Sequence, residues 1–455
     1  MDSGRSALYT QGSVRRTMLR TAFAMLAGTL AISGYNIVDT YFVGQLGKIP
    51  LAAMGFTFPV VMIVGCIFMG IAAGIMTTTA QALGGGLKFR AVNIVSSGLL
   101  MTVVISLWLG LLGLWLNPRL FRLMGASDEA LPLAVGYMNI WYIGCVTASL
   151  SMAGNKLLIG AGNPNEAACM MVLGLIVNAV LDPFFIFGWL GLPAMGIRGA
   201  ALATVLAQGV SALLLLVLLK LKHRLIQFRR YRFRELSPLW KLIARYAFPA
   251  SLGMLMIPAA SFVVTWITAQ FGDAAVAAVA ASGRLEGIAF IFPMALGIPM
   301  LSMVGQNYGA KLYTRIRECF RFAMGFAFFF LLGMAVVYFF FSRYIVRFFT
   351  PDAEVQEVMT TCLLIVPWGF AATEMHRYSG FFYTGCNRPA FSAWLNLFRI
   401  AGLLLPLCFL ALYFRSLTGL FVARLISDGT SGLVGFLLAR RMLRKLPADG
   451  QEEIR

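Results

Sequence analysis

Two carboxylates stand inside long apolar stretches of this sequence. Asp39 and Asp182 each follow a long apolar run. An ionisable group inside such a run, where the run crosses a membrane, costs about 2.5–3.5 kcal/mol on insertion scales and is therefore a candidate for a function. Burial disfavours the charged form of a carboxylate, and a second carboxylate nearby disfavours it further. Such a pair can take up a proton on one side of a membrane and release it on the other.

Other oxygen-bearing side chains share the helical faces of these acids. Asn178 lies four residues before Asp182, and Tyr35 lies four residues before Asp39. Residues four apart lie on one face of a helix, and Thr204 adds a hydroxyl in a third apolar stretch. Oxygen ligands of this kind suit a proton or a hard cation such as Na⁺. We predict a coupling site at Asp39, Asn178, Asp182, Tyr35 and Thr204, in which Na⁺ would be held by Asp39, Asn178, Asp182 and Thr204. The alternative is that the acids only cap helices near the outer surface.

The apolar stretches that carry these residues are long enough to be membrane spans. Of the 455 residues, 60% are hydrophobic and 12% are charged, whereas soluble domains carry about 25% charged residues. About 20 apolar residues cross a bilayer as a helix, and continuous runs without alternation favour helices over a β-barrel. We predict twelve transmembrane helices, at roughly 19–44, 51–80, 91–117, 131–160, 165–189, 197–221, 243–271, 275–306, 320–349, 356–385, 390–413 and 418–440.

The basic residues are concentrated in alternate loops. The net charge of +19 could suggest nucleic acid, but its placement argues against that partner. With the N-terminus in the cytoplasm, the inner segments hold 25 Lys and Arg and the outer loops hold seven. This positive-inside pattern predicts a multi-pass protein of the plasma (inner) membrane with both termini in the cytoplasm.

The chain repeats itself at a constant offset, and the acids are not repeated. At an offset of 225 residues, the matches include Gln45 with Gln270, Gly47 with Gly272, Gln81 with Gln306 and Gly160 with Gly385. Asp39, by contrast, falls on Val264. Each half holds six spans, and an even number returns the chain to the same side. The halves should therefore be related by a pseudo-twofold axis along the membrane normal, with the functional cavity between them.

These features predict an all-α polytopic membrane protein made of two six-helix bundles. The predicted divisions are a cytoplasmic N-terminus (1–18), an N-terminal lobe (19–221), a basic cytoplasmic linker (222–242), a C-terminal lobe (243–440) and a cytoplasmic tail (441–455).

Several other charged or titratable residues lie in the predicted spans of the second half. Candidates to line a substrate cavity are Arg284, Glu286, Glu374 and His376. The alternative is local neutralisation, of Arg284 with Glu286 and of Glu374 with its neighbours. Arg399, Arg424 and Asp428 are predicted to pair between the last two spans. Two histidines and no CxxC pair make a zinc or haem site unlikely on chemical grounds, so we expect no cofactor besides the coupling ion, H⁺ or Na⁺.

Four segments resemble the multidrug and toxic compound extrusion (MATE) family, and within it the DinF-type branch. They are NIVDTYFVGQLG (Asn36–Gly47), NAVLDPFFIFG (Asn178–Gly188), GIRGAALAT (Gly196–Thr204) and GQNYGAK (Gly305–Lys311). The resemblance covers essentially the whole chain. It implies a twelve-helix, two-lobe exporter driven by inward H⁺ or Na⁺, with a cation site in the first lobe. By position, Asp39 corresponds to the family's acid in span 1, and Asn178 with Asp182 to its pair in span 5. Tyr35 and Thr204 correspond to its supporting ligands.

Two features depart from the family pattern. A related branch carries an acid in span 7, whereas residues Arg245–Gly272 contain none, which disfavours a cation site of that kind in the second lobe. The DinF-type branch is also associated with a proline that bends helix 1. Ala24 stands at the corresponding position here, so Gly28 and Gly34 are the candidates to soften that helix.

We therefore expect a secondary active antiporter that exports organic, cationic or amphipathic compounds in exchange for H⁺ or Na⁺ by alternating access. Its partners would be small organic molecules and the bilayer, and not nucleic acid; the oligomeric state stays open, with a monomer as the working expectation. The alternative is a lipid-linked precursor flippase, which should have more spans and more cationic residues. An intramembrane enzyme would need a catalytic arrangement that the sequence does not offer. The sequence has no GxxxxGK[ST] motif, which argues against direct drive by ATP.

Overall fold

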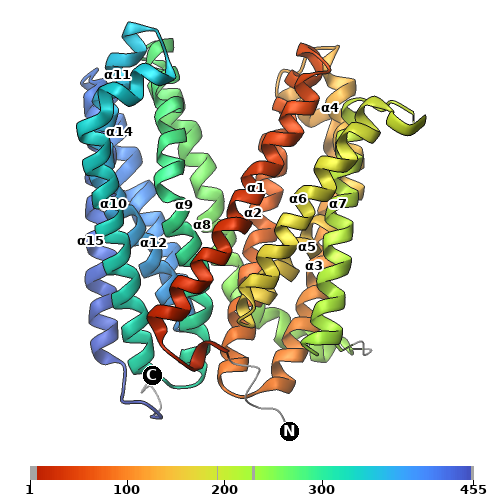
Figure 1. Ribbon diagram of the computed structural model, residues 1–455, viewed down its shortest axis with the longest axis vertical. Coiled ribbons are helices and arrows are strands. Elements are labelled where there is room, and N and C mark those ends of the chain that lie inside the picture. Colours follow the sequence, from red (N-terminus) through yellow and green to blue (C-terminus); the bar gives the residue numbers. More distant parts are fainter. Residues whose placement is uncertain (1–7, 192, 228–230, 452–455) are drawn as a thin grey trace. The chain divides into compact units, whose positions relative to one another are not determined.

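The computed structural model describes residues 8–191, 193–227 and 231–451, which form helices and connecting turns without any strand (Figure 1). Small parts of the predicted N-terminus, linker and tail (1–7, 228–230 and 452–455) lie outside the described residues. The helices of the first half are α1 (Val14–Gly44), α2 (Lys48–Gly84), α3 (Lys88–Leu123), α4 (Ala130–Ile143), α5 (Cys145–Gly160), α6 (Pro164–Phe187) and α7 (Ile197–Val217). Short helices η1 (Leu8–Thr10), η2 (Trp189–Gly191) and η3 (Leu218–Lys222) accompany them.

The second half has a corresponding set of helices. They are α8 (Phe233–Ala269), α9 (Asp273–Gly309), α10 (Tyr313–Phe349), α11 (Ala353–Ile365), α12 (Phe370–Gly385), α13 (Pro389–Leu397), α14 (Leu405–Tyr413) and α15 (Leu417–Lys445). The segment η4 (Val366–Gly369) joins α11 to α12, and η5 (Phe398–Leu404) joins α13 to α14.

Most of these helices are membrane spans by length and composition. Ten helical stretches of the described chain are long and apolar enough to cross a membrane, and the bent pair α4 and α5 adds an eleventh. The helix α1 has 31 residues, so it is about 46 Å long and exceeds the bilayer core of about 30 Å. With α1 as the twelfth span, the predicted fold class is confirmed.

The backbone repeats as closely as the sequence does. The helices α2 and α9 begin and end at positions 225 residues apart (48 and 273, 84 and 309). The fourth span is broken at Gly144, where α4 and α5 meet at 55°, and the counterpart of Gly144 is Gly369, at the break before α12. Positive φ also recurs at matched turns: Gly47 and Gly272 (109° and 101°), Gly86 and Lys311 (74° and 58°), Gly162 and Asn387 (91° and 65°), and Leu190 and Arg415 (58° and 48°). Both halves therefore fold by the same local turns.

The chain forms two compact units, and the division between them falls within two helices. The first unit contains Phe23–Ser251 and the second contains Tyr9–Ala22 together with Leu252–Arg455. The start of α1 thus belongs to the second unit and the rest of α1 to the first. In the same way, α8 gives its first half to the first unit and its second half to the second.

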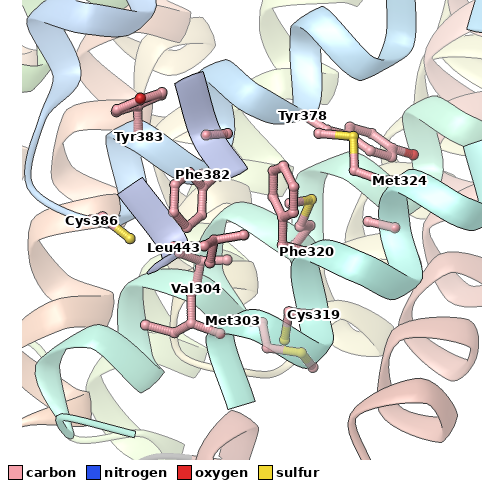
Figure 2. Packing of buried hydrophobic residues seen from close by; sticks show 14 of the residues in the cluster. Met303, Val304, Cys319, Phe320, Met324, Tyr378, Phe382, Tyr383, Cys386 and Leu443 are labelled. Carbon is pink, nitrogen blue, oxygen red and sulfur yellow. The ribbon is translucent and has the colours of Figure 1, made fainter. Parts of the chain in front are cut away.

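The start of the chain is held in the second unit by packing and by hydrogen bonds. Tyr9, Val14, Met18 and Ala22 are buried in a core that also contains Phe320 and Phe382. Figure 2 shows the rings of this last pair side by side, and their centroids are 5.0 Å apart.

Arg315 of α10 adds polar anchors to this segment. Its guanidinium donates to the carbonyls of Tyr9 (3.2 Å), Gln11 (3.1 Å) and Gly12 (2.8 Å). Asn307 also donates to the Tyr9 carbonyl, at 3.1 Å. Carbonyl groups that no helix or strand satisfies thereby find partners.

Candidate functional site

Three helices of the first unit bring the predicted coupling residues together. Asp39 comes from α1, Asn178 and Asp182 come from α6, and Thr204 comes from α7. Asn178 and Asp182 are 0% exposed and Asp39 is 5% exposed, so none of them is a solvated cap at the surface.

Close packing of α6 against α7 is what positions this cluster. A Cβ at Gly199 of α7 would overlap the carbonyl of Phe185 in α6, so only glycine allows the two backbones to approach this closely. Pro183 follows Asp182 inside α6. Proline has no N–H, so it leaves the carbonyl of Ala179, four residues earlier, without its helical donor. The helix therefore offers an additional oxygen near the acids.

The side chains of the cluster contact one another directly. Thr204 Oγ1 donates to Asp39 Oδ2 at 3.4 Å, and Asn178 Nδ2 donates to Asp182 Oδ1 at 3.4 Å. The Tyr35 hydroxyl donates to the Thr204 carbonyl at 3.3 Å. The carboxyl groups of Asp39 and Asp182 lie within hydrogen-bonding reach of each other. Two like charges this close repel, so a proton or a cation between them would stabilise the cluster.

Three buried oxygens of the cluster lack hydrogen-bond partners in the described part of the chain. They are Oδ1 of Asp39, Oδ1 of Asn178 and Oδ2 of Asp182. An unpaired buried polar atom in a native fold requires an explanation such as an ion. Carboxylate, amide and hydroxyl oxygens are the donors that a hard cation takes, so this set fits Na⁺ as well as H⁺. The described residues contain no group of three or more His, Cys, Asp or Glu side chains that could hold a metal ion, so Na⁺ would depend on the amide and hydroxyl oxygens.

Sequence reasoning missed one neighbour of the cluster. Tyr137 of α4 is buried and lies close enough to Asp39 and Asp182 to interact with both electrostatically. Nothing in its sequence position pointed to this place, because it shares no helical spacing with either acid.

A second polar cluster lines a cavity of about 480 Å³ in the second unit. Glu286 of α9, Arg399 of η5 and Arg424 of α15 are the charged residues in its wall. Arg424 contacts Glu286 at 2.5 Å and Asp428 at 3.7 Å. Arg399 Nε lies 3.5 Å from the other oxygen of Asp428. The predicted pairing of Arg399, Arg424 and Asp428 is confirmed.

The four predicted cavity residues lie in different surroundings. Glu286 lines the cavity, whereas Arg284 is exposed. The predicted local neutralisation of Arg284 with Glu286 is wrong, because residues two apart do not face each other on a helix, and Glu286 pairs with Arg424 instead.

The other two predicted cavity residues are buried in α12, outside the wall of this cavity. Glu374 contacts its neighbour Arg377 at 3.2 Å, as the local alternative predicted. His376 Nε2 lies 3.1 Å from Oδ1 of Asn396.

Comparison with known proteins places this geometry among transporters. A sequence model of the MatE family matches residues 24–184 and 249–410, two stretches that begin 225 residues apart (249 − 24). The FAD transporter of Shewanella oneidensis is 32% identical over 443 residues, which are 96% of each chain. A probable multidrug resistance protein of Bacillus subtilis is 24% identical over 428 residues, 92% of each chain.

Solved structures share the fold over nearly the whole chain. The MATE transporter of Vibrio cholerae in its bent form has a TM-score of 0.88 at 27% identity, covering 94% of this chain and 97% of its own. A transporter of the MOP superfamily from Pyrococcus furiosus, described as having a binding pocket of reverse polarity, has a TM-score of 0.87 at 25% identity. That match covers 97% of this chain and 98% of the other.

Proposed function

Because the chain belongs to the MATE family of membrane transporters, we propose that it is a secondary active antiporter that exports organic compounds in exchange for H⁺ or Na⁺. The chain is a multi-pass membrane transporter of small molecules and not an enzyme. Ion coupling is general in this family, whereas the ion used here is part of the proposal. Both termini would lie in the cytoplasm of a plasma-membrane protein, since the basic loops favour that side.

The observation that carries this proposal is the pair of buried carboxyl groups, Asp39 and Asp182, with unpaired oxygens around them. Binding of H⁺ or Na⁺ between them removes their repulsion and draws α1 toward α6. Release of the ion restores the repulsion. Ion occupancy thereby changes the packing of α1, which is the step that an antiporter must link to substrate binding. A charge that moves inward gains about 2.3 kcal/mol per 100 mV of membrane potential.

The two kinds of relative differ in what they transport, as their names state: FAD for one and multiple drugs for the other. We propose substrates that combine an apolar or aromatic body with a charged group. The cationic character expected from the sequence stays a prediction.

Reconstitution into proteoliposomes tests the proposal. Transport of FAD and of a fluorescent organic cation would be measured under a pH gradient or a Na⁺ gradient, each imposed alone. We expect one gradient to drive transport by the wild type and Asp39→Asn to abolish that drive. Asp273→Asn is the matched control, because Asp273 is an exposed acid at the start of α9. Wild-type transport that ignores both gradients would exclude coupled antiport, and normal drive in Asp39→Asn would remove Asp39 from the coupling site.

A further inference from the structure

We propose that the cavity of the second unit binds the anionic group of an aromatic substrate, and that Arg399 is the residue that contacts this group. The role rests on the export function proposed above and specifies its substrate class: organic anions that carry phosphate or carboxylate on an aromatic or apolar body.

The size and lining of the cavity suit such a compound. Its volume of about 480 Å³ lies within the range of about 300–1,000 Å³ that is usual for small-molecule sites. Most of the wall is apolar, with Phe370 and Phe421 among its residues. Hydroxyl groups of Ser261, Thr265 and Thr268 also line it. An apolar wall with a few polar groups is the usual composition of a site that buries an aromatic ligand.

Arg399 has donors that the protein itself does not use. Its guanidinium makes no side-chain hydrogen bond to any described residue. Its Nε lies 3.5 Å from Asp428, which is an ion-pair contact but leaves the Nε–H without a hydrogen-bond partner. Guanidinium presents five donors in a planar fork that matches a carboxylate or phosphate. An arginine in a cavity wall with its donors unsatisfied is suited to take those acceptors from a ligand.

The surrounding charges allow Arg399 to take this role without leaving an acid unpaired. Two arginines and two carboxylates form the cluster, and Arg424 contacts both Glu286 and Asp428. When Arg399 turns to a ligand, Asp428 keeps Arg424 as its partner. The charges that face Arg399 from the packed helices are thus accounted for within the cluster, and an incoming anion meets a cation and not a net negative wall.

The internal repeat shows that shared packing does not require this cluster. At the offset of 225 residues, Arg399 falls on Gly174 and Arg424 falls on Gly199. Both glycines are buried in the first unit. The same scaffold therefore folds with no side chain at these positions, and the arginines belong to what the second half does differently.

A binding experiment without any ion gradient tests the site apart from the transport mechanism. The purified full-length protein in detergent would be titrated with FAD, with riboflavin, which has the same aromatic ring and no phosphate, and with tetraphenylphosphonium. We expect saturable binding of FAD by the wild type. We expect Arg399→Gln to weaken it by about tenfold or more, the usual effect of losing hydrogen bonds to a charged group. Riboflavin affinity should stay within about twofold, since it has no anionic group to lose.

Two pairs of variants keep the outcome interpretable. Arg343→Gln removes an exposed arginine and should leave FAD binding unchanged. Gly283→Leu fills the cavity from α9, where an added Cβ meets no atom within 4 Å. It should weaken both FAD and riboflavin, whereas Gly333→Leu on exposed α10, equally free of contacts, should weaken neither. Gly283→Leu also serves if Arg399→Gln does not fold.

The outcomes separate this inference from the proposed function. Equal FAD affinity in Arg399→Gln and the wild type, or wild-type binding of tetraphenylphosphonium but not of FAD, would overturn the anion site. Gradient-driven export of the cation in that second case would leave the antiporter intact. FAD binding that depends on Arg399, without transport under either gradient, would support the site and contradict the antiporter.

Discussion

Thr204 on α7 donates its hydroxyl hydrogen to Asp39 on α1 across 3.4 Å, and its own backbone carbonyl accepts from Tyr35 on the same α1. One residue thus ties α7 to α1 twice, through its side chain and through its backbone. Any ion that binds Asp39 must share that carboxyl group with Thr204, so the strength of this bond should set how readily the site loads and empties.

Thr204→Val tests the hydroxyl alone, because valine keeps the shape and the backbone carbonyl. A hydrogen bond to a charged group contributes about 1.5–3 kcal/mol, so we expect the ion concentration for half-maximal transport to change by about tenfold or more. Thr147→Val is the control, since Thr147 also bonds to a carbonyl of α7, that of Val205 at 3.3 Å. An unchanged ion dependence in Thr204→Val would show that this hydroxyl does not act on the site.

Asp182→Asn removes one of two neighbouring like charges and keeps the size of the side chain. We expect gradient-driven transport to be lost and the melting temperature not to fall, because the variant relieves repulsion within the buried cluster. Thermal unfolding in detergent, followed by intrinsic fluorescence, and transport in proteoliposomes would be measured together. A strong fall in melting temperature would mean that Asp182 mainly stabilises the fold.

Arg315→Gln removes the three hydrogen bonds that hold the carbonyls of Tyr9, Gln11 and Gly12. We expect faster amide hydrogen exchange at residues 9–12 with little change elsewhere, because local opening needs only these contacts to be lost. Arg317 is the matched control: it donates to Leu443 and Leu446 near the other end of the chain. Arg317→Gln should accelerate exchange there instead. Exchange at residues 9–12 that stays slow in Arg315→Gln would contradict the anchoring role.

Leu190→Gly should raise stability at a turn. Leu190 has φ 58° and is 88% exposed, so glycine removes the strain of a left-handed leucine and little packing is lost. That conformation costs about 1–2 kcal/mol for an L-residue, and the greater freedom of glycine in the unfolded chain offsets part of the gain. Leu123, 87% exposed at the end of α3, has no such strain, so Leu123→Gly should not stabilise. Thermal unfolding of both variants checks the contrast, and a lower melting temperature for Leu190→Gly would refute it.

The sequence was sufficient for the features that depend on local pattern and on the repeat. Long apolar runs predicted the spans, and matches such as Gly47 with Gly272 fall at turns where both halves have positive φ. The four-residue spacing of Asn178 and Asp182 placed them on one face of a helix, where they are bonded at 3.4 Å.

The remaining features depend on which helices pack together, and helical periodicity does not record that. Glu286 pairs with Arg424, which is 138 residues away, whereas the sequence suggested its neighbour Arg284. The place of Tyr137 beside the acids has the same origin. The division of the chain within α1 and α8, and not at the basic linker, also follows from packing, since an unbroken helix can belong to two cores.

The membership of α1 in both units offers a way to observe the ion site from a distance. The helix carries Asp39 near one end, and its other end at Val14 is buried beside the segment that Arg315 anchors. These two places are about 38 Å apart along a continuous helix. A helix of this kind shifts or rotates as one body, so a spectroscopic probe attached near Gln11 would report when the buried acids load and empty. The amino-terminal segment would then serve as an indicator of occupancy that needs no substrate.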